Sequence, residues 1–112
     1  MTQILDQEII EELAFVMGDD MAEFIGTFIS YSADLLGQMS RHAENADLNG
    51  LILVVHSFKG SSKNIGANVL GDLLYALEQS LRNDGLTDVD AAFPLIHQAY
   101  EDVCSALQSY LH

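Results

Sequence analysis

The chain has 112 residues, of which 49% are hydrophobic and 19% are charged. This balance is that of a globular protein and not of a disordered one, and the length allows one hydrophobic core but not two. Asp and Glu number 17 against 4 Lys and Arg, which gives a formal net charge of -13. Because nucleic acids and anionic membranes bind proteins chiefly through Lys and Arg, neither is an expected partner. We expect residues 1–112 to form a single domain.

The sequence also bears on the compartment. No apolar run reaches the length of a transmembrane helix, and the first ten residues, MTQILDQEII, lack the basic start and apolar stretch of a signal peptide. The single cysteine, Cys104, cannot form an internal disulfide, which fits a reducing compartment. We therefore expect a cytoplasmic protein in which Cys104 serves packing.

Hydrophobic periodicity predicts helices along the whole chain, beginning with two in the first half. A short first helix is predicted from about Asp6, a plausible N-cap, to Met17, before Gly18 stops it. A long second helix is predicted from about Asp20 to His42. Its apolar stripe is expected to consist of Phe24, Phe28, Tyr31, Leu35 and Met39.

The third helix is predicted over about residues 48–65, after a break and a new N-cap within residues 45–47. Gly66 follows it and can adopt the left-handed conformation that ends many helices.

A fourth helix is predicted to begin near Ala67 and to end at residues 83–85. Its apolar stripe consists of Leu70, Leu73, Leu74, Leu77 and Leu81. A fifth is predicted to start near Thr87, although Pro94 indicates either a kink or a start a few residues later. Connections this short force neighbouring helices to run antiparallel. The predicted fold is therefore all-α, an up-down-up-down four-helix bundle with the first helix covering one end.

The third helix carries a histidine whose place on the helical wheel is informative. At about 100° per residue, His56 lies opposite an arc of apolar and small residues, namely Leu51, Val54, Phe58, Ser61, Ser62 and Ile65. That arc is expected to face the core, so His56 is expected to face away from it. The histidine's own face carries Ile52, Leu53, Lys59, Gly60 and Lys63. Because Gly costs about 1 kcal/mol inside a helix, and Ile and Leu seldom share a solvated face, we expect a partner to use this face.

These residue types suit phosphoryl transfer to an imidazole. A neutral imidazole is a good nucleophile at physiological pH, and a nearby ammonium such as that of Lys59 can neutralise charge on the phosphoryl oxygens. A glycine at position 60, four residues after the histidine, removes a side chain that would obstruct an approaching partner.

The same residues resemble the phosphorylation motif of histidine phosphotransfer domains, written HxxKGxxxxxGA. The matching positions are His56, Lys59, Gly60, Gly66 and Ala67, and the similarity continues more loosely over the whole chain. The resemblance implies that His56 is the phosphoacceptor, with Lys59 and Gly60 supporting it. It also implies response-regulator receiver domains and hybrid sensor kinases as partners, no cofactor, and transfer from one receiver to another. Lys63 is not part of the family pattern.

The fourth helix supplies a candidate neighbour for the histidine. His56 lies ten residues before the turn at Gly66, so an antiparallel helix reaches the same level near Ala76. Glu78 borders the apolar stripe there and is expected to accept a hydrogen bond from Nδ1, which leaves Nε2 as the nucleophile. The alternative is that Glu78 is a solvated residue at the edge of the stripe. We expect Ile52, Leu53 and Lys63 to take part in docking, and the protein to be a monomer.

Two other functions remain open. The first is a metal-binding bundle, because the chain contains His42, His56, His97 and His112 among many carboxylates. Di-iron bundles place a Glu three residues before each ligand histidine, and the first three of these histidines have none there. The second is a docking adaptor of the same fold whose histidine is never phosphorylated. No GxxxxGK[ST] phosphate-binding loop is present, so we expect no kinase activity of its own and a phosphoryl group supplied by another protein.

Overall fold

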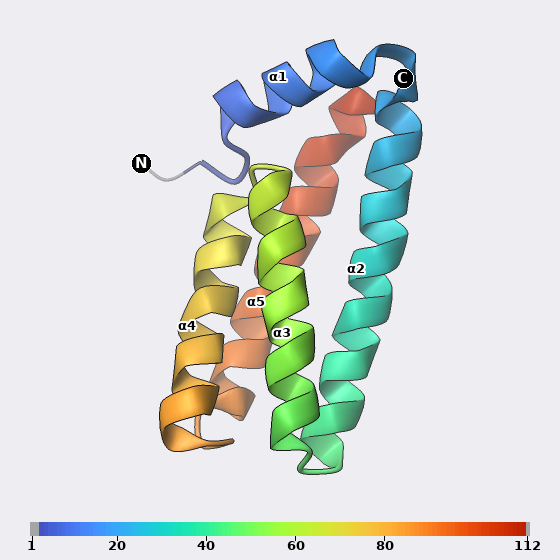
Figure 1. Ribbon diagram of the computed structural model, residues 1–112. Helices are drawn as coiled ribbons and strands as arrows, with labels where there is room; N and C mark the ends of the chain where they lie inside the picture. Colours follow the sequence, from blue (N-terminus) through green and yellow to red (C-terminus); the bar gives the residue numbers. More distant parts are fainter. Residues whose placement is uncertain (1–2, 112) are drawn as a thin grey trace.

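Helices make up nearly all of residues 3–111, the part of the chain that the computed structural model describes (Figure 1). In chain order they are α1 (Gln7–Met17), the 3-10 turn η1 (Gly18–Asp20), α2 (Met21–Glu44), α3 (Leu48–Asn64), α4 (Asn68–Asp84), α5 (Val89–Leu107) and the 3-10 turn η2 (Gln108–Tyr110). No strand occurs within these residues, and the predicted all-α fold is confirmed.

Local sequence signals set the helix ends. The Asp6 side chain caps α1 by accepting hydrogen bonds from the backbone N–H groups of Glu8 (3.0 Å) and Ile9 (3.3 Å). Asp47 caps α3 in the same way through the N–H of Gly50 (3.0 Å). Gly66 follows α3 with a φ of +83°, a value that favours glycine and that ends the helix as predicted.

The fifth helix begins before its proline. Val89 is its first residue, close to the predicted start near Thr87, and Pro94 lies inside it, so the alternative of a later start at the proline is wrong. A proline in the second turn is tolerated because it removes only one helical hydrogen bond, while the apolar face of α5 remains packed.

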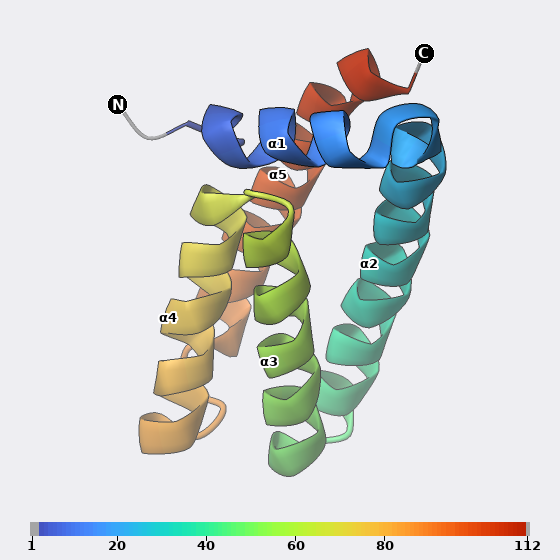
Figure 2. The same cartoon turned by 45° about the horizontal axis from the view of Figure 1, so that its top comes forward.

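Helices α2 to α5 lie side by side as an antiparallel bundle, and α1 crosses the end that holds the α3–α4 turn (Figures 1 and 2). Two hydrogen bonds fix α1 to that turn: the Asp6 N–H donates to the Gly66 carbonyl (2.8 Å), and the Asn68 amide donates to the Asp6 carboxylate (3.4 Å). The predicted arrangement of a bundle with one covering helix is confirmed.

The core runs along the axis of the bundle. Its largest fully buried side chains come from all five helices: Ile10, Ile25, Met39, Leu51, Val55, Phe58, Ile65, Leu70, Leu74, Leu81, Ile96 and Leu107. Phe58 meets the edge of Tyr100 at 6.1 Å between ring centroids. The Tyr100 hydroxyl donates to the Ile29 carbonyl (2.9 Å), and burial together with the half-buried Cys104 thiol raises the pKa of Tyr100 above its usual range. These contacts join α5 to α2 and α3.

The predicted apolar stripe of α2 is partly wrong. Tyr31 is 46% exposed and Phe24 is only half-buried, whereas Ile25 and Ser32 are buried with Phe28, Leu35, Leu36 and Met39. A tyrosine at the border of a stripe can keep its hydroxyl in water, while a serine is small enough to lie between packed helices.

The predicted core arc of α3 is correct but too narrow. Its members are buried except Ser61, which is half-buried and donates to the Phe58 carbonyl (3.1 Å). Val55, which the predicted arc does not include, is also fully buried, and Ile52, predicted on the histidine's face, is half-buried against the core. The reason is that α3 packs against α2 on one side and α4 on the other, so two neighbours cover more of its surface than one would.

Within residues 3–111, no helix combines the length and the hydrophobicity needed to cross a membrane.

Candidate functional site

His56 lies in the middle of α3 and faces solvent. Its side chain is 60% exposed, as the helical wheel predicts. Helix α3 is uninterrupted on both sides of it, so the ring is carried by a rigid element and not by a loop. One edge of the ring faces α4 and the rest is open to a partner.

Glu78 on α4 lies behind the ring. Its Oε2 is 2.9 Å from Nδ1 of His56, and the residue is only 3% exposed. The antiparallel count around Gly66 therefore located it correctly, and the alternative of a solvated Glu78 is wrong. A carboxylate buried to this degree must have hydrogen-bond donors to compensate for lost water.

Lys59 supplies one of those donors. Its Nζ donates to Oε1 of Glu78 (2.8 Å) and lies 5.5 Å from the centroid of the Tyr75 ring, a cation–π distance. The sequence predicts that this ammonium lies beside the histidine and neutralises charge on the phosphoryl oxygens. The structure instead shows it paired with the carboxylate behind the ring.

Arg82 supplies two more donors and was missed by the sequence analysis. Its Nη2 and Nε donate to Oε2 of Glu78 at 2.9 and 3.3 Å. The spacing of Glu78 and Arg82 is i, i+4 on α4, which commonly pairs opposite charges on a helix. That spacing was readable in the sequence once Glu78 had been singled out.

The donors determine the ionisation of Glu78. Burial acts to raise its pKa, but the hydrogen bonds from Lys59, Arg82 and His56 outweigh burial and lower the pKa from 4.5 to about 2. Glu78 is therefore an anion at physiological pH. An ionised carboxylate can only accept, so the proton of a neutral His56 lies on Nδ1 and the lone pair lies on the exposed Nε2.

The other predicted site residues lie around the ring at different depths. Gly60 is exposed, and a Cβ at this position would have no neighbouring atom within 4 Å. Leu53 is 69% exposed, whereas Ile52 is half-buried. Lys63 is drawn towards α4, where its Nζ pairs with Asp72 (2.7 Å) and its aliphatic chain covers Gly71.

The histidines do not gather into a metal site in the described part of the chain. Residues 3–111 contain no group of three His, Cys, Asp or Glu side chains that could hold a metal ion. His42 pairs instead with Asp47 (3.1 Å), and His112 lies outside the described residues.

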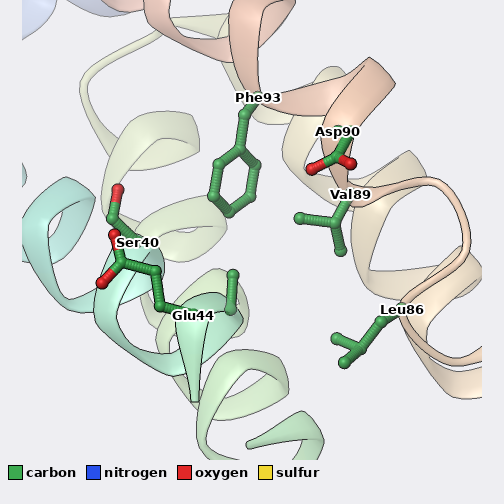
Figure 3. Close-up of a pocket in the computed structure, with 7 residues that line it drawn as sticks. Ser40, Glu44, Leu86, Val89, Asp90 and Phe93 are labelled. Carbon is green, nitrogen blue, oxygen red and sulfur yellow. The ribbon is translucent and has the colours of Figure 1, made fainter. Parts of the chain in front are cut away.

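A cavity of about 400 Å³ lies between α2 and the start of α5, lined by residues that include Ser40, Glu44, Val89, Asp90 and Phe93 (Figure 3). Neither His56 nor Glu78 lines this cavity.

A four-helix bundle that exposes one edge of a histidine ring and buries a carboxylate against the other has the features of a protein phosphoryl carrier. The family comparison agrees, since the Hpt domain family matches residues 23–108. The chain therefore belongs to the Hpt domain family.

Two relatives support this assignment. The chain is 26% identical over 109 residues to the phosphorelay intermediate protein rdeA of Dictyostelium discoideum. The match covers 97% of this chain and 43% of rdeA, so the chain spans less than half of that protein. The crystal structure of histidine-containing phosphotransfer protein B of Pseudomonas aeruginosa superposes with a TM-score of 0.93 at 26% identity, covering 99% of this chain and 96% of the other.

Proposed function

We propose that His56 carries the phosphoryl group, taking it from the aspartyl phosphate of one response-regulator receiver domain and giving it to the aspartate of another. The observation that carries this proposal is the exposed ring whose Nδ1 is held by the ionised Glu78 (2.9 Å). Membership of the Hpt domain family supports it.

The transfer step follows from the tautomer of His56. The Nε2 lone pair attacks the phosphorus atom, the Nε2–P bond forms as the P–O bond to the aspartyl carboxylate breaks, and that carboxylate leaves as an anion. The Nδ1 proton stays in place, so the phosphorylated ring gains positive charge, which the Glu78 carboxylate stabilises at 2.9 Å. Return of the phosphoryl group to a second aspartate reverses these bond changes.

Lys59 and Gly60 support the step in different ways. Lys59 is one turn from His56 on the same face and can bring its ammonium to the equatorial phosphoryl oxygens. Gly60 leaves bare backbone on the side from which the partner approaches, because no side chain covers that part of α3.

The docking surface is proposed to surround the ring. Leu53 is the most exposed apolar residue of α3, with Ile52 and Lys63 at the border of the surface. Helix α1 is proposed to extend it through two apolar side chains left in solvent, Phe15 (89% exposed) and Val16 (71%). Large exposed apolar side chains of this kind are typical of partner-binding surfaces.

The partners are proposed to be receiver domains and the hybrid sensor kinases that carry them. Residues 1–112 are proposed to act as a single, monomeric domain in the cytoplasm, without a cofactor or metal and without kinase activity of their own. A net charge of -13 supports the monomer, because identical polyanions repel one another.

The test is transfer of radiolabel from a phosphorylated receiver to the wild type and to His56→Gln. We expect the wild type to be labelled and the variant to stay unlabelled, with unchanged circular dichroism and melting temperature, because the ring lies outside the core. Full labelling of the variant would contradict His56 as the acceptor. A wild type that binds receivers without being labelled would indicate the docking adaptor instead.

A further inference from the structure

Glu78 accepts more hydrogen bonds than the orientation of one histidine requires. Oε1 accepts from Lys59, and Oε2 accepts from Arg82 as well as facing Nδ1 of His56. Two of the chain's four Lys and Arg residues therefore contact one buried carboxylate. Lys59 and Arg82 reach the carboxylate from different helices and bind different oxygens, so Glu78 has two independent cationic partners.

Lys59 has two proposed roles: it pairs with Glu78, and it neutralises the phosphoryl oxygens. Its Nζ is 2.8 Å from Oε1 of Glu78, on the side of the ring that carries Nδ1. The proposed phosphoryl group is attached to Nε2, on the exposed side. If the Lys59 ammonium turns towards the phosphoryl oxygens, its hydrogen bond to Oε1 weakens, and Glu78 then depends on its other cationic partner.

Arg82 is placed to compensate for that loss. It binds Oε2, the same oxygen that faces Nδ1, through two donors at 2.9 and 3.3 Å, and it approaches from α4 itself. Its side chain is half exposed and makes no hydrogen bond to the ring of His56. Removing one partner from a buried charge is costly when no other partner remains, so a second cation lowers the cost of releasing Lys59.

We propose that Arg82 is a positioning residue that keeps the Glu78 carboxylate aligned with Nδ1 of His56 while Lys59 exchanges between Glu78 and the phosphoryl group. The proposal rests on the proposed function of His56. Arg82 acts through Glu78 and does not contact the phosphoryl group. Lysine at this position can supply the charge but not the two-donor contact, so Arg82→Lys should restore function only in part.

A double-mutant cycle between Arg82 and Glu78 tests the proposal. The variants are Arg82→Ala, Arg82→Lys, Glu78→Gln and the double variant Arg82→Ala/Glu78→Gln, with Arg41→Ala on α2 as a control for the loss of one exposed cation. Two quantities are measured: the rate of transfer from a phosphorylated receiver at subsaturating concentration, and the ring tautomer of His56 from ¹⁵N chemical shifts in the unphosphorylated protein.

We expect Arg82→Ala to slow transfer about tenfold, because it removes both hydrogen bonds of a half-exposed cation to the carboxylate. It should also increase the fraction of the Nε2–H tautomer, which a purely structural role would leave unchanged. In the Glu78→Gln background the same substitution should change the rate less than about twofold, since the carboxylate through which it acts is gone. Arg41→Ala should match the wild type.

Two results would overturn the proposal. An equal effect of Arg82→Ala in both backgrounds would mean that Arg82 acts on the partner and not through Glu78. An unchanged tautomer in Arg82→Ala would mean that it does not align the carboxylate. A wild type that takes no label would instead contradict the function of His56, and the tautomer measurement would still decide whether Arg82 positions Glu78.

Discussion

The two ring nitrogens of His56 have different roles in the proposed site. Nδ1 of His56 is held by Glu78, Nε2 is left for the reaction, and the carboxylate is in turn held by Lys59 and Arg82. In the proposed transfer, this arrangement places a negative charge where the ring becomes positive. It also links the chemistry of the site to the stability of the fold, because Glu78 is buried.

That link makes the contribution of Glu78 to stability depend on pH. Its pKa in the fold is about 2, below the ordinary value of 4.5, so its contribution is complete above pH 4.5 and is lost as the pH falls towards 2. The free energy of unfolding of the wild type should therefore exceed that of Glu78→Gln by more at pH 6 than at pH 2. The change in that difference should be on the order of 3 kcal/mol. Urea unfolding of both proteins across this range measures it, and a difference independent of pH would contradict the assigned ionisation.

The sequence predicts the positions of the site residues better than the partners of their side chains. The position of Glu78 could be counted from the turn at Gly66, because antiparallel helices fix which levels face each other. The partner of each lysine could not, because it depends on where the flexible side chain ends: Lys59 binds Glu78, while Lys63 binds Asp72. Arg82 is not predicted, because the sequence motif describes residues around the imidazole ring and not those around the carboxylate that holds it.

At the scale of the helices, the ends were more predictable than the buried faces. Capping by Asp6 and the left-handed turn at Gly66 depend on a few neighbouring residues, so both were readable from sequence. The buried face of a helix depends on how many neighbours surround it. That is why Tyr31, predicted in the apolar stripe of the second helix, is exposed, and why the burial of Val55 is not predicted.

Gly66 provides a test of how the elements are joined. Its φ of +83° disfavours any side chain, and a Cβ there would lie 3.2 Å from the side chain of Ile9 on α1. Gly66→Ala should lower the free energy of unfolding by about 1–3 kcal/mol. The matched control is Gly26→Ala, in open space on α2, which should raise it by about 0.5–1 kcal/mol. Equal effects of the two substitutions in chemical denaturation would contradict the role of Gly66 in the turn.

The exposed face of α3 yields a second prediction at this scale. Leu53→Asp should weaken receiver binding at least tenfold by placing a charge in the contact, and Gly60→Gln should do so by obstructing approach. Neither should lower the melting temperature by more than a few degrees, because Leu53 is 69% exposed and a Cβ at Gly60 meets no neighbour.

The control for this experiment is Leu95→Asp, which changes an exposed leucine of α5 in the same way. It should bind a labelled receiver like the wild type. Unchanged affinity in both α3 variants would place the docking surface elsewhere, and a large loss of stability in Leu53→Asp would mean that this side chain belongs to the core.

The whole molecule is a rigid support for one side chain. Four packed helices hold His56 and Glu78 in register from two different elements, and α1 fixes the turn between them through Asp6 and Gly66. The ring is left open to solvent, so the partner must complete the site. In the proposed function, this all-α bundle with a net charge of -13 presents the nucleophile, and the partner brings the phosphoryl group.

The most direct test of the account is the site of phosphorylation on the ring. The wild type should be phosphorylated by a receiver and studied by NMR of the ¹⁵N-labelled histidine together with ³¹P. We expect a phosphoryl group on Nε2 of His56 and a proton on Nδ1, with a bond that is labile in acid and stable in alkali. Phosphate on Nδ1 would contradict the role of Glu78, and acid-stable phosphate on a serine such as Ser57 or Ser61 would contradict the account as a whole.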